Sequence, residues 1–349
     1  MKTLYESLLD DDLIGKTDNM IKDEIEAFLK ENYKGSIKIS NFPNKDGKYE
    51  VSSTTDIEVK NKKIASLTNG YFVWVEVSRH FDCSYCNRLT SLKGAPKKVG
   101  EDFYCSSCDS LTSLKGAPEK VGGNFYCDYN KSLKSLEGAP KEVGGDFDCS
   151  GCKSLESLEG VPKEIIKDFK CSNCQSLKTL KGVPEKVRGD FYCAFNISLK
   201  SLEGVSKEVG RDFYCYSCKS LKSLVGAPEK VVGSFNCSGC ESLNSLVGAP
   251  EKVGGTFDCS GCISLNSLEG APEKVGGGFY CDYCDSLTSL EGAPEKVAGG
   301  FNCSFCGSLK SLDGAPKEVG GNFECRGCKI TFTENDIKKV SNVKRKIIC

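Results

Sequence analysis

A 22-residue pattern of apolar and polar positions runs through most of the chain. A phenylalanine recurs every 22 residues, twelve times from Phe81 to Phe323, without an insertion or a deletion. Each unit reads approximately F-x-C-S-x-C-x-S-L-x-S-L-x-G-A-P-x-x-V-G-G-x. A period of this length is typical of a solenoid, because a single unit is too small to bury its own core and must stack on its neighbours.

The unit also predicts the local structure of each coil. The Phe and the first Cys of F-x-C alternate with other residues, which indicates a short strand with one buried face, so stacked units form a parallel sheet. Two leucines follow, and then a Gly and a Pro that break helices; Ser206 replaces the Pro in the sixth unit. We expect a β-rich solenoid coiled to the right. Turns, short extended pieces or 3₁₀ should form its return path, with few helices outside the terminal caps.

The unit resembles the leucine-rich repeat family, in which L-x-x-L-x-L-x-x-N/C-x-L places apolar residues on a strand and an Asn or Cys three residues later. Here V-x-x-x-F-x-C-x-x-C-x-x-L fits the cysteine-type variant, although its first apolar residue stands one position further out. The C-x-S-L-x-S-L…P-x-x-V segment is similar to repeats of bacterial cell-surface leucine-rich proteins, and the opening LYESLLDDD resembles the leader of leucine-rich repeat proteins from bacteriophages and gut bacteria. The resemblance of the repeats covers about residues 57–332 and implies the fold, but it is nearly silent on function.

Three regions are expected along the chain. Residues 1–56 form an N-terminal α/β cap, with an amphipathic helix capped by Thr17 and strands at 37–39 and 49–51 around a turn. Residues 57–332 form the solenoid, which opens with a degenerate coil and a buried strand at 71–77. Residues 333–349 form a helical cap, with a basic helix near 334–346.

Composition narrows the function classes. The 349 residues include 47 basic and 48 acidic side chains, and the numbers of the two kinds rise together along the sequence. No basic stripe forms, which argues against a nucleic-acid partner. The acidic opening lacks the apolar run of a signal peptide, and no stretch approaches 18 apolar residues, so we expect no membrane insertion. We expect a cytoplasmic protein with reduced cysteines. The sequence leaves the oligomeric state open.

The 23 cysteines include twelve C-x-x-C motifs or their variants, a spacing that suits zinc or redox chemistry. Asn130 and Asn196 replace the second cysteine in two units, and Asn is a poor zinc ligand that cannot form a disulfide. We therefore favour a structural ladder over a zinc-binding array, and we read Cys349 as a chance tail residue. The ladder comprises Cys86, Cys108, Asn130, Cys152, Cys174, Asn196, Cys218, Cys240, Cys262, Cys284, Cys306 and Cys328.

The exposed, concave face of the sheet is the candidate partner-binding surface. Aromatic residues on a rigid sheet favour protein interfaces, although aromatic residues also favour strands for structural reasons. A mid-array cluster of Tyr192, Phe195, Tyr214 and Tyr216 is the predicted hot spot. The predicted partner-binding residues are Tyr104, Tyr126, Tyr129, Asp168, Asp190, Tyr192, Phe195, Asp212, Tyr214, Tyr216, Tyr280, Tyr283 and Phe305.

No catalytic constellation can be assembled, and we assign no catalytic, cofactor-binding or metal-binding residue. His80 is the lone histidine, and the Gly-Gly pairs recur once per coil as a turn would. We predict a non-enzymatic protein-binding scaffold, encoded by a phage and directed at a host factor. The alternatives are a structural or adhesive component of a particle or surface, and the zinc-binding array. The segment LYESLLDDD at 4–12 is either a recognition tag or a frayed terminus.

Overall fold

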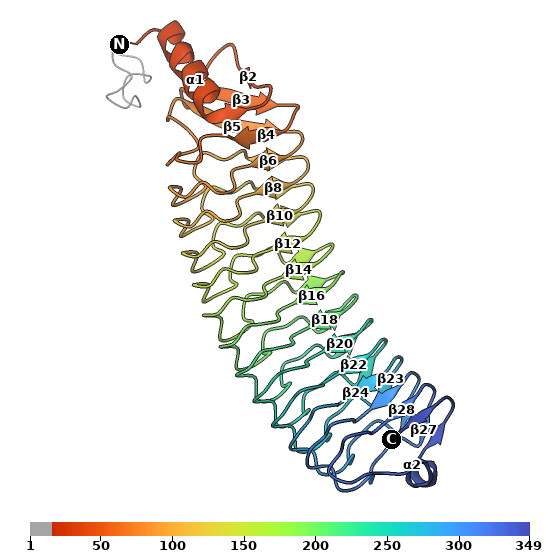
Figure 1. Ribbon diagram of the computed structural model, residues 1–349. Coiled ribbons are helices and arrows are strands. Elements are labelled where there is room, and N and C mark those ends of the chain that lie inside the picture. The colour runs from red at the N-terminus through yellow and green to blue at the C-terminus, as the bar shows by residue number, and fades with distance from the viewer. Residues whose placement is uncertain (1–15) are drawn as a thin grey trace.

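A computed structural model describes residues 16–349, which form a long, gently bent rod (Figure 1). The candidate recognition tag at 4–12 lies outside the described residues. The two helices of the described chain stand at opposite ends: α1 (Asp18–Asn32) near the N-terminus and α2 (Glu334–Val340) near the C-terminus. Between them the chain winds as a parallel β-solenoid. The predicted fold class is confirmed.

The F-x segment of each repeat forms a strand of one long sheet, here called the first sheet. It has 15 strands, of which β1 is antiparallel to its neighbour; the remaining 14 are parallel and correspond to 14 coils. Each Phe pairs with the Phe of the next coil, as Phe81 pairs with Phe103, so no register shift accumulates. The strands are β1 (Tyr33–Lys34), β4 (Ile57–Val59), β6 (Phe81–Asp82), β8 (Phe103–Tyr104), β10 (Phe125–Tyr126), β12 (Phe147–Asp148), β14 (Phe169–Lys170), β16 (Phe191–Tyr192), β18 (Phe213–Tyr214), β20 (Phe235–Asn236), β22 (Phe257–Asp258), β24 (Phe279–Tyr280), β26 (Phe301–Asn302), β28 (Phe323–Glu324) and β30 (Ile347–Ile348).

The return path carries a second sheet, as the prediction of short extended pieces required. It is divided into six strands and nine strands, and the break falls between β11 and β13. At the break Ile166 takes the place of the first glycine of the Gly-Gly pair. Arg188, Val232 and Ala298 take the same position where the strands stay paired, so this side chain alone does not explain the break. The strands are β2 (Lys38–Ile39), β3 (Tyr49–Ser53), β5 (Phe72–Val77), β7 (Lys98–Val99), β9 (Lys120–Val121), β11 (Glu142–Val143), β13 (Glu164–Ile165), β15 (Lys186–Val187), β17 (Glu208–Val209), β19 (Lys230–Val231), β21 (Lys252–Val253), β23 (Lys274–Val275), β25 (Lys296–Val297), β27 (Glu318–Val319) and β29 (Asn342–Val343).

The core is a set of parallel columns rather than a single central cluster. All twelve repeat phenylalanines are fully buried, and adjacent rings, such as Phe81 and Phe103, lie 5.0 to 5.8 Å apart between centroids. Two leucines of each coil and the first cysteine fill the space beside them. Burying one such Phe side chain contributes roughly 1.5–3 kcal/mol. Stability therefore accumulates coil by coil.

The N-terminal cap closes the open end of these columns. Thr17 caps α1 by accepting a hydrogen bond from the Met20 N–H, and the apolar stripe of the helix is buried. Trp74 of β5 and Tyr33 of β1 pack their rings against Phe81, at 5.8 and 6.2 Å between centroids. The cap also shares both sheets with the solenoid, since β1 pairs with β4 and β3 pairs with β5.

The C-terminal end differs from the sequence prediction. The helix expected near 334–346 ends at Val340, and the residues after it are extended. β29 adds to the second sheet and β30 adds to the first, so residues 342–348 make a further coil instead of a longer helix. The helix stops early because these residues find strand partners on both sheets.

Candidate binding face

The outer face of the first sheet presents three positions in each coil. They are the residue before the Phe, the residue between the Phe and the first cysteine, and the residue after that cysteine; we call this surface the sheet face. One position further on, the residue before the second cysteine stands at a turn, and we call this series the left-handed column. The predicted partner-binding residues all occupy these four series of positions.

The second cysteine of each coil forms a ladder beneath this surface. Its Sγ points to the carbonyl oxygen of the first cysteine in the preceding coil, as Cys108 does to Cys83 at 3.2 Å. Asn130 takes the same place and uses its amide fully: its Nδ2 donates to the Cys105 and Cys127 carbonyl oxygens at 3.0 and 2.8 Å. Its Oδ1 accepts the Cys108 N–H at 2.7 Å. Asn196 makes the same three bonds.

The cysteine side chains are free thiols, and those of the ladder contact backbone carbonyl groups. All 23 are free; 21 are buried, Cys328 is half-buried and Cys349 is exposed. Burial raises the pKa of Cys86 to about 11 and that of Cys218 to about 12, so at neutral pH both keep their protons. Zinc binds the thiolate. A metal array would therefore have to displace these protons, and among residues 16–349 no three cysteine Sγ atoms lie within 4.8 Å of one another.

The acidic residues before the Phe form a second ladder, which corrects one expectation. We predicted Asp168, Asp190 and Asp212 to be exposed partner-binding residues, but Asp190 is only 7% exposed. Asp168 accepts the Asp190 N–H at 2.9 Å, and Asp190 accepts the Asp212 N–H at 3.0 Å, each through Oδ1. A carboxylate placed here satisfies a strand-edge N–H of the next coil. These aspartates therefore link coils together, and only their second oxygen faces outward.

The second carboxylate oxygen, Oδ2, often accepts a hydrogen bond from a tyrosine of the sheet face. The phenols of Tyr192 and Tyr214 donate to Asp190 and Asp212, at 3.0 and 2.7 Å. Burial and this hydrogen bond raise the pKa of Tyr214 to about 12. Tyr104 is held by Asp102 in the same way.

The predicted hot spot is one contiguous aromatic cluster. The rings of Tyr192 and Tyr214 stack at 4.7 Å, and Tyr216 meets Phe195 edge to face at 5.0 Å and Tyr214 at 6.3 Å. Elsewhere on the sheet face, Tyr104 stacks on Tyr126 at 5.0 Å; Tyr280 packs instead against the backbone of Gly278. Much of the ring area on the sheet face is therefore covered by neighbouring rings.

The left-handed column contains the most exposed aromatic side chains near the sheet. Its aromatic members have φ of 56° to 62° and exposed fractions of 38% to 62%; they are Tyr85, Tyr129, Phe195, Tyr283 and Phe305. In other coils the same position is Ser107, Asn173 or a glycine such as Gly151. Tyr283 and Phe305 stack at 4.8 Å on adjacent coils.

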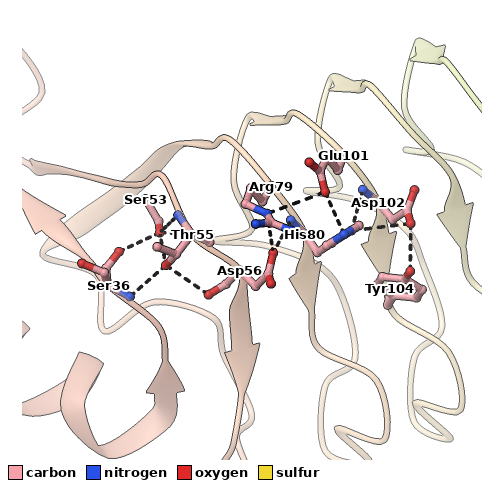
Figure 2. A network of polar contacts seen from close by, with 9 residues as sticks. All are labelled: Ser36, Ser53, Thr55, Asp56, Arg79, His80, Glu101, Asp102 and Tyr104. Atoms are coloured by element: carbon pink, nitrogen blue, oxygen red, sulfur yellow. Dashed lines mark hydrogen bonds and ion pairs between the residues drawn. The ribbon is translucent and has the colours of Figure 1, made fainter.

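His80 and its neighbours form the polar network of Figure 2. Among the described residues, Asp56, His80 and Glu101 bring their potential ligand atoms within 4.8 Å of one another. However, His80 Nδ1 accepts the Asp102 N–H at 3.2 Å, so the neutral ring carries its proton on Nε2, which donates to Glu101 at 2.8 Å. A histidine that ligates a metal through Nε2 normally donates from Nδ1 instead. Asp56 Oδ1 accepts the His80 N–H at 3.4 Å in the same way, so Asp56, His80 and Asp102 are successive members of one ladder.

Comparisons with known proteins do not assign this chain to a family. No protein-family model and no curated protein matches the chain. A solved leucine-rich repeat protein from Bacteroides ovatus is similar at 16% identity, over 89% of this chain and 98% of that one, with a TM-score of 0.37. The stacked coils, the strand of each repeat and the Asn/Cys ladder define the protein as a leucine-rich-repeat-like β-solenoid. In residues 16–349, no helix has the length and apolar character needed to cross a membrane.

Two features of this surface escaped the sequence prediction. The left-handed backbone was signalled by the Gly, Asn and Ser residues that alternate with aromatics before the second cysteine. Tyr85 belongs with the exposed aromatics but was absent from the predicted binding set. Asp128, Asp146 and Asp148 were also omitted, although they lie on the sheet face among the predicted tyrosines.

Proposed function

We propose that this protein is a non-enzymatic scaffold that binds another protein through the sheet face and the left-handed column. The observation that carries the proposal is the exposure of five large aromatic residues on left-handed backbone. Such residues offer large, rigid contact areas, and Tyr is enriched among the residues that dominate binding energy at protein interfaces.

Structural preference does not account for these five residues. Aromatic residues favour strands, but the left-handed column lies at a turn, where a bulky residue is an outlier and glycine or asparagine costs less. The fold accepts Ser107, Asn173 and Gly151 at the same position. Residues that cost stability without filling the core are commonly maintained by function.

Three other expectations have less support. A phage protein directed at a host factor is supported only by the resemblance of the N-terminal LYESLLDDD. A structural or adhesive role would use the same exposed aromatics between copies of the chain. The zinc-binding array is disfavoured by the buried, protonated thiols, and elemental analysis of the purified protein tests it directly.

The test compares binding with stability in one variant. Tyr129→Asn, Phe195→Asn and Phe305→Asn together remove three aromatic rings while keeping a residue that the left-handed backbone accepts, as at Asn173. We expect the variant to retain or exceed the wild-type free energy of unfolding, since each left-handed bulky residue costs about 1 kcal/mol. We also expect it to lose proteins that the wild type captures from a cell lysate.

The matched control is Ser107→Asn with Ser217→Asn, which changes the same column without removing a ring. The control should capture the same proteins as the wild type. Equal capture by the aromatic variant would refute the proposal, whereas concentration-dependent self-association of the wild type in light scattering, lost in the aromatic variant, would favour the assembly role.

A further inference from the structure

We propose that the N-terminal part of the sheet face binds a lysine- and arginine-rich extended segment of its partner protein. This inference rests on the proposed function and names the chemistry of the partner. It concerns the seven coils that begin at Phe81 through Phe213. Three observations carry it: the negative charge of this surface, the contacts that Lys170 makes on it, and the similar set of side chains around Tyr126.

Charge is strongly uneven over the molecule. In these seven coils the three positions of the sheet face hold eight aspartates and one lysine, a difference of seven negative charges. In the last five coils the same positions hold Asp258, Asp282 and Glu324 against Arg326. The whole chain has a net charge of −1. The first seven coils thus present a negative surface that favours a basic partner.

Lys170 shows how a basic side chain fits this surface. Its ammonium group lies 3.1 Å from Asp146 Oδ2 and 3.6 Å from Asp168 Oδ2. It also stands 5.8 Å from the ring centroid of Tyr192, close enough for a cation–π interaction. Burial acts to lower the pKa of Lys170, but the hydrogen bond to Asp146 and the nearby carboxylates outweigh it and raise the pKa. Two carboxylates and one tyrosine therefore bind an ammonium ion well.

The coils just before Lys170 offer the same groups and hold no lysine at the three positions of the sheet face, although Lys170 itself already contacts Asp146. Tyr126 stacks on Tyr104, and Asp128, Asp146 and Asp148 stand around them on the sheet face. Asn124 takes the place of the aspartate that would precede Tyr126, so the Tyr126 phenol lacks the carboxylate partner that Tyr104 has in Asp102. Burial raises the pKa of Asp148, and a cation beside it would favour its charged form.

The repeat geometry suits an extended ligand. Strands of a parallel sheet lie about 4.8 Å apart, and alternate side chains of an extended peptide are about 6.6 Å apart. The two spacings differ by about 1.8 Å per step. A segment that runs along the rod can reach carboxylates of several coils only because the flexible four-carbon stem of lysine makes up this difference. Because these groups are only partly buried, the attraction should weaken with added salt.

The experiment measures the affinity of the full chain for a synthetic peptide of alternating lysine and glycine, by calorimetry at low and at physiological salt. Asp146→Asn with Asp148→Asn should weaken binding about tenfold. Asn124 and Asn236 occupy the same two series of positions and make the corresponding ladder bonds, so the substitutions keep the local hydrogen bonds. The matched control, Asp258→Asn with Asp282→Asn, should change affinity by no more than about twofold.

A second pair of variants separates the site from general charge. Lys170→Met removes the internal ammonium ion and should tighten peptide binding about threefold. Lys230→Met, on the second sheet where Lys230 pairs with Glu208 at 2.7 Å, makes the same change in net charge and should have no effect. Equal tightening by both variants, or equal weakening by the two double Asp→Asn variants, would overturn the site.

The outcome is distinguishable from a failure of the proposed function. A captured protein that is lost with the aromatic variant of the left-handed column, but is indifferent to salt and to Lys170→Met, would leave the scaffold role intact and refute the basic partner. An alternating glutamate and glycine peptide serves as the negative probe, and binding equal to that of the lysine peptide would also refute it.

Discussion

The side-chain amide of Asn130 donates a 3.0 Å hydrogen bond to the Cys105 carbonyl oxygen of the preceding coil. In most coils a thiol makes the corresponding contact, as Cys152 does with Cys127 at 3.2 Å. The two side chains are therefore alternative solutions to one requirement, a buried donor aimed at the previous coil. Asn satisfies more groups than Cys does, because it also accepts a backbone N–H.

Substitutions of Asn130 should follow from this relationship. Asn130→Ala leaves the Cys105 carbonyl oxygen and the Cys108 N–H without a partner, whereas the Cys127 carbonyl oxygen keeps the Cys152 thiol. The variant should lower the free energy of unfolding by about 2 kcal/mol. Asn130→Cys restores the thiol contact found in neighbouring coils and should cost less than half as much. Urea denaturation under reducing conditions measures both. Equal losses would contradict the ladder role.

The aspartate ladder predicts a different pattern at Asp190. This residue accepts the Asp212 N–H and the Tyr192 phenol, so Asp190→Ala should cost about 2 kcal/mol. Asp190→Asn keeps an oxygen acceptor toward the next coil, as Asn124 does toward Asp146, and should cost about 0.5 kcal/mol. Thermal unfolding of the two variants checks this. If Asp190→Ala is neutral for stability but abolishes partner binding, the carboxylate acts on a partner instead.

Thiol accessibility provides a third prediction. Cys349 is exposed, Cys328 is half-buried and the remaining 21 cysteines are buried. We expect one thiol to react rapidly with a disulfide reagent in the folded protein, a second to react slowly, and the others to react only in denaturant. Cys349→Ser should remove the rapid phase alone. Rapid reaction of several further thiols would show that the coils open easily.

Sequence reasoning was most successful where one residue type repeats at one position. The recurrent Phe and Cys predicted the strand and the solenoid, because only a fixed register keeps such residues buried in every coil. Asn130 and Asn196 revealed the ladder, because Asn tolerates burial only when its amide finds backbone partners. Both inferences depend on local chemistry that the sequence carries by itself.

The sequence was insufficient where a role depends on the distance between coils. An aspartate at the edge of a strand has the same pattern whether it faces solvent or accepts a neighbour's N–H, so Asp190 was expected to be exposed although it is buried. Cys349 was likewise taken for a chance tail residue. Ile347 pairs with Phe323, which places Cys349 in register with Cys325 as the first cysteine of a further coil. The intervening helix α2 obscures this spacing of 24 residues.

Alkaline pH should unfold this protein more sharply than most. Burial raises the pKa of the buried thiols from the ordinary value of 9.0, to about 11 for Cys86 and about 12 for Cys108. The folded state thus holds protons that the unfolded chain releases above pH 9, so the stability from each thiol is complete below pH 9 and is lost as pH rises toward its folded pKa. Each thiol contributes a loss of about 1.4 kcal/mol per pH unit once it is ionised in the unfolded chain.

Urea denaturation with reductant present, between pH 7.5 and 10, measures this dependence. We expect a constant free energy of unfolding up to about pH 8 and a steep fall above pH 9, because many thiols titrate together. Cys240→Asn replaces one thiol with the residue that the Asn130 and Asn196 coils already accept, and should reduce the slope above pH 9 by about 1 kcal/mol per pH unit. Ser260→Ala, on the sheet face, should leave the slope unchanged. A free energy of unfolding that stays constant to pH 10 would mean that the thiols are not buried as protonated groups.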